Sequence, residues 1–145
     1  MDTISRTARS RNMARIRSKD TQPELAVRSA AHRLGYRFRL HRHDLPGTPD
    51  LVFPGLRKAI FVHGCFWHCH ARCVDGRFPK SRKSYWTPKL LGNQLRDRRN
   101  ARRLREQGWS VSVIWECETA RSRRLEHRLQ GVLSRAESRR HPKVR

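Results

Sequence analysis

Residues 63–73 constrain the fold more than any other part of the chain. These eleven positions hold three cysteines, three histidines and two large aromatic residues, and they directly follow the apolar run 59–62. Cysteine sulfur and histidine nitrogen at this spacing suit a tetrahedral zinc ion, which can fold a short loop that has no core of its own. Four ligands would be enough, and with the distant Cys117 the chain offers seven. The surplus histidines are therefore available for acid–base work near neutral pH or for a second, catalytic metal ion.

The charge of the chain indicates its partner. Among 145 residues, 34 Lys and Arg face only 12 Asp and Glu, which gives a formal net charge of +22 distributed along the whole length. So large a charge causes self-repulsion unless a polyanion relieves it, which favours nucleic acid as the partner. A membrane surface is disfavoured, because the sequence contains neither a basic amphipathic helix with a clean apolar face nor a lipidation motif.

The chain is expected to form one folded domain between two basic ends. Residues 1–20 are rich in Arg and Ser and predict an arm that orders on DNA, residues 21–136 form the domain, and residues 137–145 form a basic tail. No signal peptide or membrane span is apparent, so we expect a cytoplasmic protein. In that reducing compartment the four cysteines favour metal binding over disulfides.

The apolar periodicity predicts the element order α-β-β-β-α-β-α, a mixed sheet flanked by helices, which is an α/β fold of the α+β kind. Thr21 and Gly35 delimit the first helix, and Glu24 in its first turn would cap backbone N–H groups. Strands are expected at residues 36–40, 50–53, 58–63 and 109–115, of which the third is buried on both faces. The later helices are expected at residues 87–107 and 121–136.

Asp50 follows Pro49 at the start of a predicted strand hairpin, which places its carboxylate at the mouth of the sheet. This arrangement resembles the restriction-endonuclease-like fold named for its PD-(D/E)xK motif, in which the Asp binds Mg²⁺ and the next strand supplies a second acid and a lysine. Here the next strand ends in Phe61, Val62 and His63. It supplies no acid, and His63 stands in the position of the lysine.

Several separated motifs make the resemblance more specific. The chain closely resembles the very-short-patch repair (Vsr) endonucleases at residues 11–13, 45–50, 63–68, 96–99 and 108–117, in the order of that family. The resemblance implies an enzyme that nicks one DNA strand 5′ of the thymine in a T:G mismatch, the product of 5-methylcytosine deamination. It also implies catalytic Mg²⁺, a structural zinc, a monomer, other repair proteins as partners, and a bacterial cytoplasmic enzyme that is nucleoid-associated when acting.

The resemblance assigns roles by position. Asp50 and the backbone carbonyl of Val62 would bind Mg²⁺, while His63 and His68 would flank the scissile phosphate. Imidazole is a fitting general base, and His68 is the first choice for that role, with the assignment between the two histidines left open. Further candidates, for orienting a histidine or a metal-bound water, are Glu24 and Asp97. A helix cap for the first and a surface salt bridge for the second are equally supported alternatives.

For zinc, the resemblance selects Cys65, His70, Cys73 and Cys117, which would tie the last strand to the loop. An all-cysteine site, with Cys69 in place of His70, stays open.

Three further residues are assigned to DNA intercalation by the resemblance, Phe66 and Trp67 from one groove and Met13 from the other. Aromatic residues held on a metal loop are well placed to enter a base stack as wedges. The alternative is that Phe66 and Trp67 fill an apolar core around the zinc.

Two other classes of function agree with parts of the sequence. A zinc-stabilised DNA-binding module without catalysis would explain the charge and the cysteines, but it would need neither Asp50 nor the surplus histidines. A sequence-specific restriction-type nuclease on the same fold would need them, and it would cut both strands of intact duplex, usually as a dimer.

Overall fold

A four-stranded sheet forms the middle layer of the molecule, in a computed structural model that describes residues 20–71, 73 and 76–134. The strands lie in the order β1 (Arg39–Leu40), β2 (Leu51–Phe53), β3 (Lys58–His63) and β4 (Ser110–Trp115). The first three are antiparallel neighbours, and β4 runs parallel to β3. The predicted mixed sheet and its element order are confirmed.

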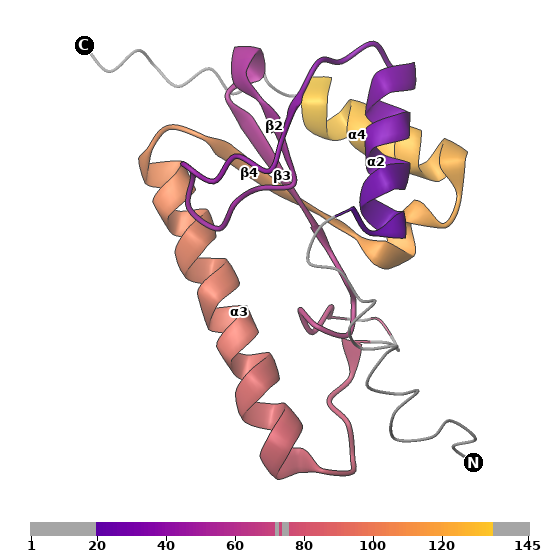
Figure 1. The fold of residues 1–145 in the computed structure, drawn as a ribbon. Coiled ribbons are helices and arrows are strands. Elements are labelled where there is room, and N and C mark those ends of the chain that lie inside the picture. The colour runs from indigo at the N-terminus through magenta and orange to yellow at the C-terminus, as the bar shows by residue number, and fades with distance from the viewer. Residues whose placement is uncertain (1–19, 72, 74–75, 135–145) are drawn as a thin grey trace.

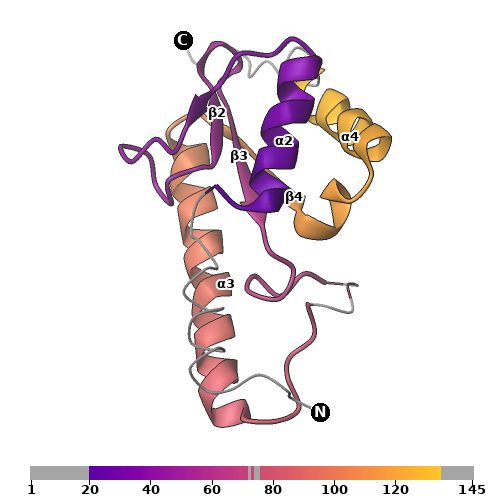
Figure 2. The ribbon, with the colours of Figure 1, turned by 45° about the vertical axis from the view of Figure 1, so that its right-hand side comes forward.

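Helices cover both faces of this sheet (Figures 1 and 2). α2 (Gln22–Arg33) and α4 (Ser122–Ser134) lie side by side on one face. α3 (Lys83–Glu106) joins β3 to β4 across the other face and extends well beyond the sheet. Two short 3-10 helices, η1 (Pro54–Leu56) and η3 (Glu116–Thr119), follow β2 and β4. Among the described residues, no helix combines the length and the apolar character that crossing a membrane requires.

The sheet separates two apolar clusters, because successive strand residues face opposite sides. Leu51, Ile60 and Ile114 pack with α2 and α4. On the other side, Val52 and Ala59 pack with residues that include Leu104 of α3. β3 is therefore covered on both faces, as its nearly continuous apolar sequence predicts, and His63 lies at its carboxyl end.

The first helix begins and ends where the sequence predicts. The Thr21 hydroxyl accepts a hydrogen bond of 3.3 Å from the N–H of Glu24, and Gly35, at a φ of +86°, follows the C-cap. A positive φ of this size favours glycine, which has no Cβ to clash with the backbone. Glu24 is consequently held in the first turn of α2, where its side chain is buried.

The strand expected at residues 36–40 is shorter than predicted. Only Arg39 and Leu40 pair with β2, because β2 itself has three residues and His41 leaves the extended region at a φ of 45°. Phe38 does not pair with a strand; instead its ring packs against that of Phe53, with ring centroids 5.8 Å apart. Alternation of apolar and basic residues thus reflects side-chain packing here more than strand pairing.

The helix expected to open at Thr87 opens at Lys83 instead. The N–H of Trp86 already donates to the carbonyl of Arg82 at 3.1 Å, and Pro88 lies inside the helix. Proline is tolerated here because it removes one backbone hydrogen bond close to the N-terminal end. The last helix starts within one residue of its predicted position. Of the predicted ends, residues 1–19, 135–136 and the tail 137–145 lie outside the described residues.

Candidate active site and metal centre

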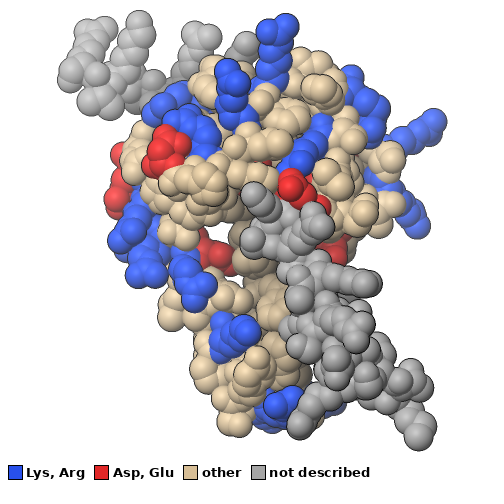
Figure 3. Space-filling model, viewed as in Figure 1, with Lys and Arg blue, Asp and Glu red and all other residues tan. Residues whose placement is uncertain are grey.

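A cleft of about 740 Å³ opens between α3 and the carboxyl ends of β3 and β4. In the space-filling view a hollow is visible between the α3 side and the sheet side of the molecule (Figure 3). Its lining includes four of the residues that the sequence singles out, namely Asp50, His63, His68 and Asp97. Asp50 directly precedes β2, His63 ends β3, His68 lies in the loop that follows, and Asp97 lies in α3. The fold therefore brings together residues that are distant along the chain.

Asp50 is fixed by the neighbouring strand. Its Oδ2 accepts a hydrogen bond of 2.6 Å from the backbone N–H of Val62. Burial, followed by the neighbouring Glu24 carboxylate, raises the pKa of Asp50 to about 8. A cation beside this carboxylate would favour the ionised form that burial opposes, so the site suits a metal ion by its chemistry.

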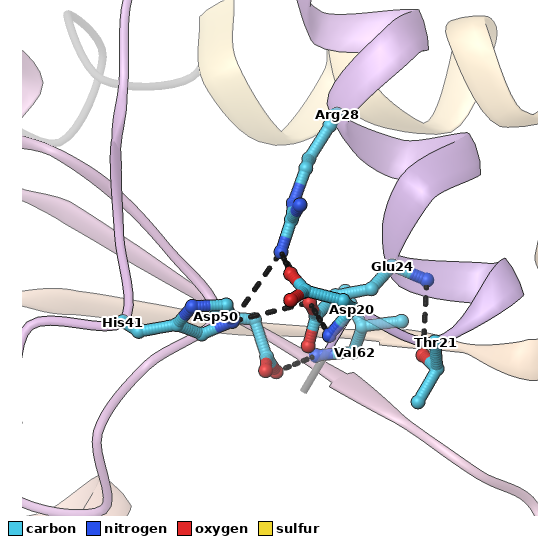
Figure 4. Close-up of polar contacts among 7 residues, drawn as sticks. All are labelled: Asp20, Thr21, Glu24, Arg28, His41, Asp50 and Val62. Atoms are coloured by element: carbon cyan, nitrogen blue, oxygen red, sulfur yellow. Dashed lines mark hydrogen bonds and ion pairs between the residues drawn. The ribbon is translucent and has the colours of Figure 1, made fainter. Parts of the chain in front are cut away.

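Glu24 supplies a second carboxyl group beside Asp50 (Figure 4). Its side chain is only 2% exposed, and its Oε2 accepts hydrogen bonds from the Asp20 backbone N–H at 2.8 Å and from Arg28 at 2.5 Å, with His41 Nε2 at 3.1 Å. Burial opposes ionisation of Glu24, but hydrogen bonds from Asp50, the Asp20 N–H and His41 outweigh it, so its pKa is lowered. The pKa values of the two carboxyl groups are therefore shifted in opposite directions, up for Asp50 and down for Glu24.

The acid that lies beside Asp50 therefore comes from α2, whereas the PD-(D/E)xK pattern takes it from the strand next to β2. Glu24 takes a backbone N–H, as the cap interpretation predicts, and it also lies in the site. The sequence interpretation missed Arg28 and His41, which complete this group. Arg28 follows Glu24 by one helical turn, a spacing that favours an ion pair and could have revealed it. His41 comes from a loop, and no local pattern links it to α2.

A second group is formed by two histidines and an aspartate. The His63 and His68 rings stack with centroids 3.8 Å apart and planes 6° apart. His68 Nδ1 lies 2.6 Å from Asp97 Oδ2, which joins the loop to α3. Burial, followed by the charge of His68, lowers the pKa of His63 to about 4. His63 is accordingly neutral near pH 7, and Asp97 makes a contact inside the cleft lining instead of an isolated surface pair.

The four residues selected for zinc converge. One donor atom from each of Cys65, His70, Cys73 and Cys117 lies within 4.8 Å of the others. His70 Nδ1 is 3.6 Å from the Cys65 sulfur and 3.5 Å from the Cys117 sulfur. Three thiols and one imidazole at this separation fit a tetrahedral zinc, whose ligand atoms all lie about 2.0–2.3 Å from the metal.

Cys69 lies apart from this cluster. Its Sγ is 4.0 Å from the Leu90 carbonyl oxygen of α3, and it is outside the group of mutually close ligand atoms. A left-handed φ of 53° at Cys69 accompanies this different direction. The geometry thus favours the mixed Cys/His cluster over the all-cysteine alternative.

The predicted wedge residues form an aromatic cluster beside this loop. Phe66 and Trp67 pack edge to face at 5.2 Å, and both contact Trp86 of α3, at 5.2 and 5.8 Å. All three are half-buried, so they are neither a closed core nor fully free. Trp86 was missed in the sequence because it lies in the first turns of α3, where a basic loop was expected to end. Met13 lies outside the described residues.

Comparison with known proteins identifies the family. A family model described as DNA mismatch endonuclease Vsr matches residues 1–74. The type II nicking enzyme V.XorIIP of Xanthomonas oryzae pv. oryzae is 53% identical over 132 residues, which cover 91% of this chain and 96% of that protein. The DNA mismatch endonuclease Vsr of Escherichia coli is 41% identical over 116 residues, which cover 80% of this chain and 74% of that protein. The chain belongs to the Vsr family.

Membership of the Vsr family makes this protein a DNA endonuclease and confirms the resemblance found in the sequence. The interpretation as a non-catalytic DNA-binding module is set aside. The surface agrees with a DNA substrate, because Lys and Arg side chains are spread over the face in Figure 3 and acidic side chains are few. α3 alone carries eight of the basic residues: Lys83, Lys89, Arg96, Arg98, Arg99, Arg102, Arg103 and Arg105.

Proposed function

We propose that this Vsr-family endonuclease nicks one strand of duplex DNA on the 5′ side of the thymine in a T:G mismatch, with Mg²⁺ as its catalytic metal. The observation that carries the proposal is that Asp50 lines one cleft together with His63, His68 and Asp97, while the carboxyl group of Glu24 lies beside that of Asp50. Phosphodiester hydrolysis needs a nucleophilic water, neutralised charge on the phosphate and a stabilised leaving oxygen. Carboxylates and imidazoles together can meet these needs.

The carboxyl pair fits magnesium by the chemistry of its donor atoms. Mg²⁺ prefers carboxylate and carbonyl oxygens and retains several waters. Asp50 and the Val62 carbonyl would hold the ion, and Glu24 would hold one of its waters. When bound, the ion neutralises phosphate charge and lowers the pKa of a water. Arg28 donates a hydrogen bond of 2.5 Å to Glu24 Oε2 and helps to hold that carboxylate in place.

The histidine group can move the proton. With its Nδ1–H donated to Asp97, the His68 ring has Nε2 available to accept a proton from water, so His68 is the proposed general base. His63 stays neutral because of its lowered pKa, and it therefore does not repel the positive charge that forms on the stacked His68 ring. Asp97 stabilises that charge directly, which is the role of the acid in a carboxylate–histidine pair.

The Cys/His cluster is proposed to hold a structural zinc. Cys65 follows β3 and Cys117 lies in η3 after β4, so one ion would tie together the ends of the two parallel strands. These strand ends also deliver the cleft residues. Zinc binding would thereby stabilise the loop that carries His68.

Mismatch recognition is proposed to rest on Phe66 and Trp67. They adjoin His68 in the chain and pack beside a basic helix, so they are placed where a bound duplex would meet both. Opening a base step costs about a few kcal/mol, and it costs less when the pair is already defective. Aromatic wedges would sense that lower cost. We expect the enzyme to act as a monomer on DNA in the bacterial cytoplasm, together with other repair proteins.

Strand-resolved cleavage of matched and T:G duplexes, with and without Mg²⁺, tests the proposal. The expected result is a nick in the thymine strand of the mismatch only, and only with Mg²⁺. Asp50→Ala should abolish nicking while duplex binding persists, because phosphate contacts supply most of the affinity. Asp44→Ala is the control, since Asp44 is an exposed acid that forms an ion pair with Arg42 on the same loop. Cutting of both strands of matched duplex would favour a restriction-type nuclease, and nicking by Asp50→Ala would refute the metal site.

A further inference from the structure

We infer that Trp115 is a positioning residue that holds the His63 ring against His68 by packing between His63 and His70. This inference rests on the proposed function, in which His63 and His68 lie beside the scissile phosphate. Nothing in the sequence interpretation or in the family comparison assigns a role to Trp115.

The aromatic rings form a continuous path from the cleft to the Cys/His cluster. The His68 ring stacks on His63, the His63 ring meets Trp115 edge to face with centroids 5.4 Å apart and planes at 73°, and Trp115 stacks on His70 at 4.1 Å and 8°. Trp115 is thus the ring that joins the proposed acid–base pair to the proposed zinc ligand. It also lines the cleft.

We expect packing to orient the His63 ring. Its Nδ1 is buried and has no hydrogen-bond partner among the described residues. Active-site histidines are ordinarily oriented by a bond at that nitrogen, as His68 is by Asp97. The His63 ring therefore depends on the rings around it, which are Phe61 at 5.6 Å, His68 and Trp115.

Trp115 is the best anchored of these neighbours. It pairs with His63 in the parallel register, so the last residues of β3 and β4 lie side by side. Its backbone N–H donates to the Glu118 carboxylate at 3.0 Å, which fixes the backbone where β4 ends. Its ring lies against His70, whose Nδ1 is within 3.6 Å of two thiols of the cluster. A zinc ion bound there would fix the His70 ring, and the His70 ring would in turn hold the Trp115 ring in place.

The variants Trp115→Leu and Trp115→Phe separate packing volume from the flat ring. Trp115→Leu keeps an apolar side chain, although a smaller one, but removes the aromatic ring that meets both imidazoles. Its single-turnover nicking rate should fall by about 10- to 100-fold, the loss typical of a displacement near 1 Å of a reacting group. Trp115→Phe should recover most of that loss. Zinc content and affinity for T:G duplex at fixed salt should stay close to those of the parent protein.

The matched control is Trp109→Leu. Trp109 is the buried tryptophan just before β4, and its ring lies 4.4 Å from Arg57 and belongs to the apolar cluster that includes Leu104 of α3. This variant should lose comparable thermal stability, yet its nicking rate below the melting transition should stay within about twofold of the parent. A rate loss in Trp109→Leu equal to that of Trp115→Leu would show that general destabilisation explains both, and would overturn the inference.

A double-mutant cycle with His63→Ala tests whether Trp115 acts through His63. In that background Trp115→Leu should cause no further loss of rate, whereas additive losses would overturn the inference. The NOE between the ring protons of His63 and His68, which stack with centroids 3.8 Å apart, provides a readout independent of catalysis in zinc-loaded protein without Mg²⁺. This NOE should weaken in Trp115→Leu and not in Trp109→Leu. Unmoved rings would refute positioning and leave the proposed function standing. Moved rings with normal nicking by His63→Ala would refute the catalytic role of His63, and with it the effect assigned to Trp115.

Discussion

Asp97→Asn tests the acid–base assignment most directly. Asn keeps the shape of the side chain but removes the negative charge that faces His68 Nδ1 at 2.6 Å. A hydrogen bond to a charged group contributes about 1.5–3 kcal/mol. The two side chains are 26% and 29% exposed, so solvent weakens the contact and a value of about 2 kcal/mol is appropriate. Because the imidazolium forms during the reaction, this energy is lost from the transition state, and the nicking rate should fall by about 30-fold.

The assay is single-turnover nicking of a T:G duplex at saturating enzyme and Mg²⁺, with duplex affinity measured separately at the same salt. Affinity should change little, because Asp97 is an acid and makes no attractive contact with phosphates. Asp44→Asn is the control for the loss of one negative charge, since Asp44 is exposed and outside both proposed catalytic groups. A rate for Asp97→Asn that equals that of Asp44→Asn would refute the role of the His68–Asp97 contact.

Three other expectations concern stability, zinc and recognition. Asp50→Asn should raise the melting temperature of Mg²⁺-free protein near pH 8 and not near pH 4. The pKa of Asp50 is about 8 in the folded protein and 3.8 ordinarily, so the carboxyl group of the unfolded chain ionises first as the pH rises. The stability of the parent protein therefore falls between those two pH values, and Asn removes this loss. A difference independent of pH would contradict this. One zinc per chain should copurify, and Cys117→Ala should lower the melting temperature more than Cys69→Ala, because only Cys117 lies in the cluster; equal effects would favour the all-cysteine site. Phe66→Ala and Trp67→Ala should keep zinc and salt-sensitive duplex binding but lose the affinity ratio between T:G and matched duplex; if the ratio persists, these rings serve packing alone.

Local features of the fold were predictable because they depend on neighbours in sequence. Thr21 and Gly35 mark the limits of α2 through a side-chain cap and a positive φ, which are properties of single residues. The apolar run of β3 predicts burial on both faces for the same reason. Where local patterns failed, packing overrode them. Of the first predicted strand, only the exposed residues Arg39 and Leu40 pair with a neighbouring strand. The helix α3 begins before Pro88 and continues through it.

The spacing of the cysteines and histidines alone did not choose among the possible zinc ligands. Cys65 and Cys69 differ little in local composition, yet one lies in the Cys/His cluster and the other contacts α3. The backbone conformation at Cys69, and the approach of α3 to the loop, separate them. Spacing limits which residues can reach a metal, and direction decides which do.

The sequence by itself determined the chemical inventory of this endonuclease: an aspartate at the start of a strand, histidines and cysteines after another, and a basic surface. Tertiary structure decided which of these groups act together. Glu24 reaches Asp50 because α2 packs on the sheet, His68 meets Asp97 because α3 crosses the opposite face, and Trp115 lies beside His63 because β4 pairs in parallel with β3. Each contact joins elements that are distant along the chain. Their distances are set by the packing of whole layers, which no local spacing of residues encodes.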